Sequence, residues 1–87
     1  MMYLTKIDPS RNMKRFYSVA IQPTILGACC LVRMHGRIGG STRVLPPVPY
    51  TSLPAAQVAL ERLVARKKRR GYTDRTNFPV DNRSQNP

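Results

Sequence analysis

Acidic side chains are scarce in this sequence of 87 residues. Four Asp and Glu residues stand against 15 Lys and Arg residues, so the formal net charge is +11. The acids Asp8, Glu61, Asp74 and Asp81 are scattered along the chain, which argues against the paired carboxylates of an acid–base catalyst. Because internal counter-charges are so few, a polyanion outside the chain is the simplest partner for the basic groups.

Cysteine is also rare, and the two residues present, Cys29 and Cys30, are adjacent. Neighbours in an extended segment point to opposite faces, so these thiols cannot form a relaxed disulfide with each other. Together with His35 they match no structural zinc spacing, and His35 is too far along the same strand to act as a base for Cys29. We therefore expect no metal, no cofactor and no enzymatic activity.

The sequence lacks a hydrophobic run long enough to cross a membrane. The best candidate, residues 19–32, is interrupted by Gln22, Pro23 and Gly27 and is shorter than the roughly 20 apolar residues that a span needs. The first residues lack the basic and apolar regions of a secretory signal. These absences predict a cytoplasmic protein whose partner is neither a membrane nor a small-molecule substrate.

What the sequence does contain is a regular alternation of apolar and polar residues. This alternation at residues 3–8, 15–22, 28–37 and 42–45 predicts four strands. The glycine-rich residues 39–41 lie between the last two of them and predict a tight antiparallel hairpin.

A helix is predicted over about residues 52–70. Thr51 or Ser52 can cap its first turn, and Gly71 follows its basic last turn as a left-handed C-cap. The proline-rich residues 46–49 before it predict an extended connection in which strand pairing ends. The apolar stripe that should pack on the sheet consists of Leu53, Ala56, Leu60, Leu63 and Val64.

Together these elements predict a small α+β fold, in which an antiparallel β-sheet of about four strands packs against one C-terminal α-helix. Residues 1–73 would form the single domain. Residues 74–87 carry only Phe78 and Val80 as large apolar groups, so we expect them to form a flexible tail.

One group of basic side chains lies on the third predicted strand. Arg33, His35 and Arg37 share a face of that strand, and Arg43 can join them across the hairpin. Like charges side by side on a sheet repel each other, and a bound anion would relieve that repulsion.

A second basic group lies on the predicted helix. Arg62, Arg66 and Arg69 fall close together on the side opposite the apolar stripe, where each guanidinium could meet a phosphate. A solvated helix face that complements the helix dipole would explain this row equally well.

Three segments of the sequence, taken in order, resemble the WGR domain family: DPSRNMKRFY at residues 8–17, LVRMHGRIG at 31–39 and RRGY at 69–72. The resemblance covers about residues 3–73. It implies a small antiparallel sheet with one helix, in agreement with the elements predicted above. Bacteria carry short stand-alone proteins of this family, and the chain resembles those versions.

The family takes its name from a Trp-Gly-Arg tripeptide, which is His35-Gly36-Arg37 in this sequence. In poly(ADP-ribose) polymerases the similar domain contacts DNA next to a strand end, with its Trp and Arg at the contact. The resemblance therefore implies nucleic-acid binding, with Gly36 and Arg37 as the positions carried over. His35 offers a smaller and more polar stacking surface than an indole would.

The leading hypothesis is a non-catalytic module that binds nucleic acid, with DNA as the first expectation. Arg33, Arg37 and Arg43 would contact phosphates, His35 would pack near a sugar or a base, and the helix arginines would widen the positive surface. Two alternatives stay open: RNA binding, because the same charges suit any polyanion, and docking to another protein as an adaptor domain.

Overall fold

The structure, a computed structural model, describes residues 1–24 and 28–76. Its elements are β1 (Met2–Asp8), the 3-10 helix η1 (Pro9–Arg11), β2 (Met13–Pro23), β3 (Cys29–Arg37), β4 (Thr42–Val44), β5 (Val48–Tyr50), α1 (Leu53–Arg69) and β6 (Thr73–Asp74). The strands form one antiparallel sheet in the order β4-β3-β2-β1-β6, and β5 pairs with β3 beside that path. The predicted α+β class is confirmed, with six strands among the described residues in place of about four.

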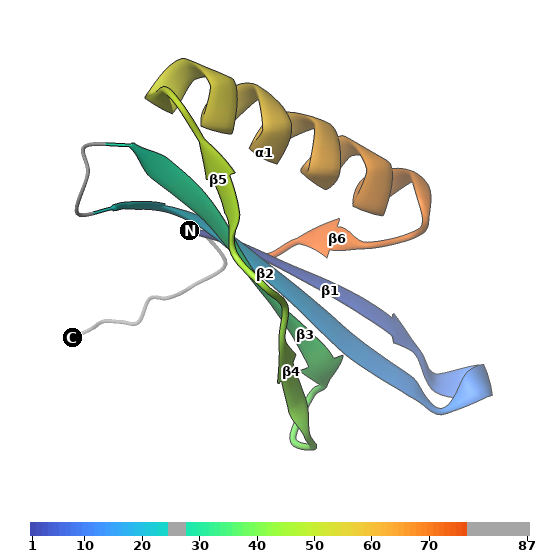
Figure 1. The fold of residues 1–87 in the computed structure, drawn as a ribbon. Coiled ribbons are helices and arrows are strands. Elements are labelled where there is room, and N and C mark those ends of the chain that lie inside the picture. Colours follow the sequence, from blue (N-terminus) through green and yellow to red (C-terminus); the bar gives the residue numbers. More distant parts are fainter. Residues whose placement is uncertain (25–27, 77–87) are drawn as a thin grey trace, which may run out of the picture.

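The core lies between α1 and the central strands of the sheet, because α1 crosses one face of the sheet (Figure 1). Successive side chains of a strand alternate between the faces, so apolar side chains of β1, β2 and β3 turn toward the helix. The buried cluster consists of Leu4, Tyr17, Val19, Leu31, Leu63 and Val64. Burying one such side chain stabilises the fold by about 1.5–3 kcal/mol, so this small cluster carries much of the stability.

The ends of α1 follow the predicted capping pattern. The Ser52 hydroxyl oxygen accepts a hydrogen bond from the Ala55 amide at 3.3 Å, and Pro54 stands in the first turn. Gly71 has a φ of +98°, the left-handed conformation expected after a helix. The predicted burial of Leu53 is wrong, because this residue lies in the first turn and is 49% exposed, whereas Leu63 and Val64 further along reach the core.

The proline-rich connection behaves differently from the prediction. Pairing does not end there, because Val48–Tyr50 forms β5 and pairs with the beginning of β3, Pro49 standing opposite Cys30. Proline removes a backbone donor, but an edge strand tolerates it where its nitrogen points away from the ladder. The pairing of β5 lengthens the sheet beneath α1, which contacts β5 as well as β2 and β3.

The sheet also continues past the helix. Thr73–Asp74 forms β6 against β1, the Arg75 amide donates to the Tyr3 carbonyl at 2.8 Å, and the Tyr3 amide donates to the Thr76 hydroxyl at 3.0 Å. Residues 74–76, which the sequence assigned to the tail, are therefore part of the sheet edge. Residues 77–87 of that predicted tail lie outside the described residues, and the division of the chain at residue 73 stays a prediction.

Gly36 of β3 stands opposite Thr42 of β4, at the end of their pairing next to the turn. A Cβ at this position would overlap the Ser41 carbonyl oxygen and would lie 3.1 Å from the Thr42 Cα and 3.2 Å from the Phe16 Cε1. Two of these neighbours are backbone atoms, so they cannot turn aside as a flexible side chain can. The glycine of the tripeptide is therefore required by the close packing of the hairpin.

The substitution Gly36→Ala is expected to lower the free energy of unfolding by about 1–3 kcal/mol, the range for an overpacked site. Urea unfolding followed by circular dichroism measures this loss. Gly39→Asn serves as the control, since Gly39 has a φ of +78° with no atom near its added Cβ, and Asn tolerates that conformation. A Gly36→Ala chain as stable as the original would contradict the packing argument.

Candidate nucleic-acid interface

The pairing of β2, β3 and β4 places the basic residues that were predicted on the strands on the same face of the sheet as α1. His35 of β3 stands opposite Tyr17 of β2 on one side and opposite Arg43 of β4 on the other. Two residues along, Arg37 stands opposite Arg15. Because residues two apart on a strand share a face, these five side chains rise from the same side of the sheet as the buried cluster.

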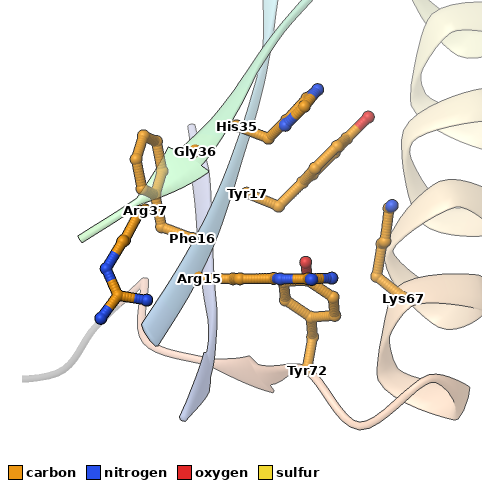
Figure 2. A pocket seen from close by; sticks show the side chains of 8 residues that line it. All are labelled: Arg15, Phe16, Tyr17, His35, Gly36, Arg37, Lys67 and Tyr72. Carbon is orange, nitrogen blue, oxygen red and sulfur yellow. The ribbon is translucent and has the colours of Figure 1, made fainter. Parts of the chain in front are cut away.

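A hollow of about 530 Å³ opens where this face meets the C-terminal half of α1. Figure 2 shows side chains from β2, β3, α1 and the segment after α1 around it. Its lining residues are Arg15, Phe16, Tyr17, His35, Gly36, Arg37, Lys67 and Tyr72. Among these described residues none is acidic, so the hollow joins cations and aromatic rings without a counter-charge in its wall.

Three rings build one wall of the hollow. The Tyr17 and His35 rings are nearly parallel, with 6.1 Å between centroids and 7° between planes, and Tyr72 meets Tyr17 edge-on at 6.5 Å. Tyr17 is only 4% exposed and belongs to the core, whereas His35 and Tyr72 are half-buried. The core thus fixes Tyr17, and Tyr17 orients the two rings that remain accessible.

Lys67 of α1 lies over these rings. Its Nζ is 4.3 Å from the Tyr17 centroid and 5.5 Å from the Tyr72 centroid, within the range of a cation–π contact. Burial is the main cause that lowers the pKa of Lys67 below its ordinary value, and the nearby charges of Arg70, Arg66 and Arg33 lower it further. Lys67 is therefore a cation surrounded by other positive charges. An anion that approached it would reduce the repulsion between these charges.

Arg37 is held by η1 and not by an acid. Its two terminal nitrogens donate to the Asn12 carbonyl oxygen at 3.0 Å and to the Asn12 Oδ1 at 3.2 Å. Asn12 ends η1 in the left-handed conformation, with a φ of 51°, which presents both oxygens to the guanidinium. In Figure 2 Arg37 turns away from Arg15, so the two like charges that face each other across the ladder separate at their tips.

The other predicted strand cations lie outside the hollow. Arg33 is half-buried and donates from its Nη2 to the Pro46 carbonyl oxygen at 3.3 Å, while its buried Nε has no hydrogen-bond partner among the described residues. Its charge still reaches Lys67, where it contributes to the lowered pKa. Arg43 is exposed on β4, next to His35 in the sheet.

The three arginines predicted on the helix do not all line the same surface. Arg62, Arg66 and Arg69 are all exposed on α1. Arg62 and Arg66 line a separate groove with Tyr50 of β5, although the charge of Arg66 also acts on Lys67. Arg69 lines neither this groove nor the hollow among the described pockets.

Three residues of the hollow, His35, Gly36 and Arg37, are thus among the residues predicted to bind, and the other lining residues are not. Arg15 and Tyr17 could have been found from an antiparallel pairing of their strand with the His35 strand, since they stand opposite Arg37 and His35. Lys67 and Tyr72 come from α1 and the segment after it, and only the tertiary fold brings them to the sheet.

Comparison with known proteins identifies the class of this domain. The model of the WGR domain family matches residues 1–79, so the chain belongs to the WGR domain family, a family of binding modules associated with nucleic acid in proteins like the poly(ADP-ribose) polymerases. A Sinorhizobium fredii protein named "Uncharacterized protein y4dW" is 36% identical over 80 residues, which are 92% of this chain and 39% of that protein. The chain thus spans about two fifths of this relative's length. No solved structure matches the chain significantly.

The described part of the chain also lacks two other features. Over residues 1–24 and 28–76, no helix is long and apolar enough to span a membrane. The same residues contain no cluster of three or more His, Cys, Asp or Glu side chains that could hold a metal ion.

The charges around Lys67 predict a specific change in its titration. Arg70→Gln should raise the pKa of Lys67 toward its ordinary value, because it removes the charge that, after burial, lowers this pKa most. NMR of the Lys67 side-chain carbons across alkaline pH measures this pKa. The folded chain releases the Lys67 proton at a lower pH than the unfolded chain does. The free energy of unfolding should therefore rise with pH between the folded and the unfolded pKa of Lys67. This rise should be smaller in Arg70→Gln.

Arg69→Gln provides the matched control for this titration. Arg69 is exposed on the same helical turn, but its charge is not among the causes of the lowered pKa. An equal change of the Lys67 pKa in both variants would show that the net charge of the chain, and not the local cluster, sets it.

Proposed function

We propose that this chain is a non-catalytic module that binds nucleic acid, DNA first, through the hollow between β2, β3 and α1. The observation that carries the proposal is the composition of that hollow. Arg15, Arg37 and Lys67 supply three positive charges beside the half-buried rings of His35 and Tyr72, with no acid in the described wall. A ligand that matches this surface carries anionic groups next to planar or apolar groups, as a nucleotide chain does.

Each group of the hollow has a distinct role in this proposal. Arg37 would donate to a phosphate with the hydrogen atoms that Asn12 does not use, and the fixed guanidinium would lose little conformational entropy on binding. Lys67 would act as a point charge at the neighbouring phosphate. His35 would pack against a sugar or a base, backed by the parallel Tyr17 ring.

The remaining cations would act at longer range. Arg43 lies beside His35 on the sheet, Arg33 and Arg66 act on the charge of Lys67, and Arg62 and Arg69 extend the positive surface along α1. Such exposed charges raise the local concentration of a polyanion and speed its approach, but they form few fixed contacts. We therefore rank Arg37 and Lys67 above Arg62 and Arg69 in their contribution to affinity.

Binding to a DNA duplex should weaken steeply with salt. If about six phosphates are neutralised, the logarithm of the association constant falls with the logarithm of salt concentration with a slope near −5. Arg37→Gln should reduce affinity by roughly 5- to 30-fold, which is the loss of one charge-assisted contact of about 1–2 kcal/mol. Arg69→Gln removes the same charge away from the hollow and should cost about twofold at most.

Fluorescence anisotropy with labelled oligonucleotides measures all three quantities. A flat salt dependence would refute binding driven by phosphate contacts. If Arg37→Gln bound DNA as tightly as the original chain, the adaptor function would take precedence. Competition between intact duplex, nicked duplex, single-stranded DNA and structured RNA then ranks the forms of nucleic acid.

The position of His35 predicts a gain of function. His35→Trp enlarges the accessible stacking surface at the position where the family carries its Trp, and stacking on one base is worth about 1–3 kcal/mol. The variant should therefore prefer nicked over intact duplex more strongly than the original chain does. His35→Ala should lose that preference, and equal nick preference in all three chains would exclude stacking at this position.

A further inference from the structure

A second groove lies beside α1, on the side of the edge strand β5. It has a volume of about 330 Å³ and is lined by Tyr50, Ala55, Val58, Ala59, Arg62 and Arg66. None of these residues lines the hollow between β2, β3 and α1. In Figure 1 β5 leads directly into the first turns of α1, and these two elements supply the whole described wall of what we call the β5 groove.

Both walls of the β5 groove are fixed by the fold. Tyr50 is half-buried and packs against the buried core cluster, and its strand pairs with β3. The five helical residues of the wall follow one another at spacings of one, three and four, so they lie along one side of α1. Because the groove exists before a ligand binds, binding requires little ordering of the protein.

The chemistry of the β5 groove changes along α1. Its first part is apolar and consists of Ala55, Ala59 and Val58, a side chain that is 47% exposed. Arg62 and Arg66 follow over the next two turns and are exposed. Neither guanidinium has a hydrogen bond or an ion pair within residues 1–24 and 28–76. The groove therefore joins an apolar end to an end with two unpaired positive charges.

No acid in the described wall neutralises the basic end. Glu61, the single acid of α1, lines a different hollow together with Leu60 and Val64. The charge of Arg66 adds to the surplus that lowers the pKa of Lys67. Carboxylates are complementary to such guanidiniums, because each can accept two parallel hydrogen bonds from the planar group.

The apolar end of the groove decides which kind of anionic ligand fits. A nucleic-acid strand carries a charge on every nucleotide, so along this groove it would place phosphates over alanine and valine side chains that offer no cation. A peptide can present an apolar side chain there and carboxylates at the basic end. From Ala55 to Arg66 the helix rises about 16 Å, a length that an extended peptide of about five residues spans.

We propose that the β5 groove binds an extended acidic peptide of a partner protein. An apolar residue of the peptide contacts Val58, and two carboxylates contact Arg62 and Arg66. The Arg–carboxylate pairs set the direction of the peptide, and the apolar contact contributes to its affinity. The proposal adds a protein partner to the nucleic-acid partner proposed above and does not depend on it, because the two sites share no lining residue.

Selection of random seven-residue peptides displayed on phage against the full chain, without nucleic acid, tests the proposal. The enriched peptides are expected to combine an apolar residue with at least two acidic residues. Fluorescence anisotropy with these peptides then compares variants of the chain. Arg62→Gln/Arg66→Gln should bind them at least tenfold more weakly. Enriched peptides without this pattern, or no enrichment, would overturn the proposal.

Arg43→Gln/Arg69→Gln is the matched control for the loss of charge. It removes two exposed arginines that line neither the β5 groove nor the hollow. This control should weaken peptide binding about twofold at most. Equal losses in the two double variants would show that net charge alone attracts the peptides, and would contradict a site in the groove.

The apolar end has its own pair of variants. Val58→Gln should weaken peptide binding several-fold, because the apolar contact is lost. Leu53→Gln is its control, since Leu53 is 49% exposed on the same helix but does not line the groove. If both variants bound the peptides with the same affinity, the proposed direction of the peptide would be wrong.

DNA binding by the same chains separates this site from the proposed function. Arg62→Gln/Arg66→Gln should bind a duplex about as tightly as Arg43→Gln/Arg69→Gln does. A tenfold loss for DNA with no loss for the peptides would assign the β5 groove to the nucleic-acid interface and overturn the proposal. Failure of the peptide selection would leave the effect of Arg37→Gln on DNA binding unchanged, so the two proposals can fail independently.

Discussion

The antiparallel ladder between β2 and β3 is the constraint on which the core and the site both depend. It runs from the Arg15–Arg37 pair to the Pro23–Cys29 pair without a break in register. One end of its helix-side face carries Val19 and Leu31 for the core, and the other end carries Tyr17 and His35 for the hollow. A slip of either strand by one residue would turn its share of both sets to the opposite face of the sheet, so the packing that secures the core also secures the register of the site.

Two of the three cations that line the hollow are held by neutral partners. The carbonyl and amide oxygens of Asn12 hold Arg37, and the faces of Tyr17 and Tyr72 hold Lys67. The C-terminal end of α1 favours positive charge through the helix dipole, which helps to accommodate its four basic residues in the last turn. An anion that enters the hollow would therefore have no internal salt bridge to displace among these contacts, and the same contacts orient Arg37 and Lys67 in its absence.

The sequence predicts local structure well where a residue type is strongly preferred in one backbone conformation or at one position, as at the ends of a helix. Ser52 and Gly71 mark the ends of α1, and strict alternation marks β2 and β3. The role of Pro49 in β5 could not be predicted, because a proline is acceptable or not according to whether its nitrogen faces a partner strand. The part of the site on β3 follows from alternation, whereas Lys67 and Tyr72 depend on where α1 crosses the sheet, which no local pattern specifies.

The placement of the hollow links ligand binding to folding. Its wall comes from β2, β3, α1 and Tyr72, elements that meet only when the core of Tyr17, Val19 and Leu63 is closed. In the proposed function, an anion that contacts the cations of the hollow together binds the folded chain more tightly than the unfolded one, and this difference in affinity stabilises the fold. A bound anion would also offset the mutual repulsion of the cations. The surplus of positive charge therefore lowers the stability of the free domain and favours binding of the anion. A site built on a single exposed loop would lack this coupling.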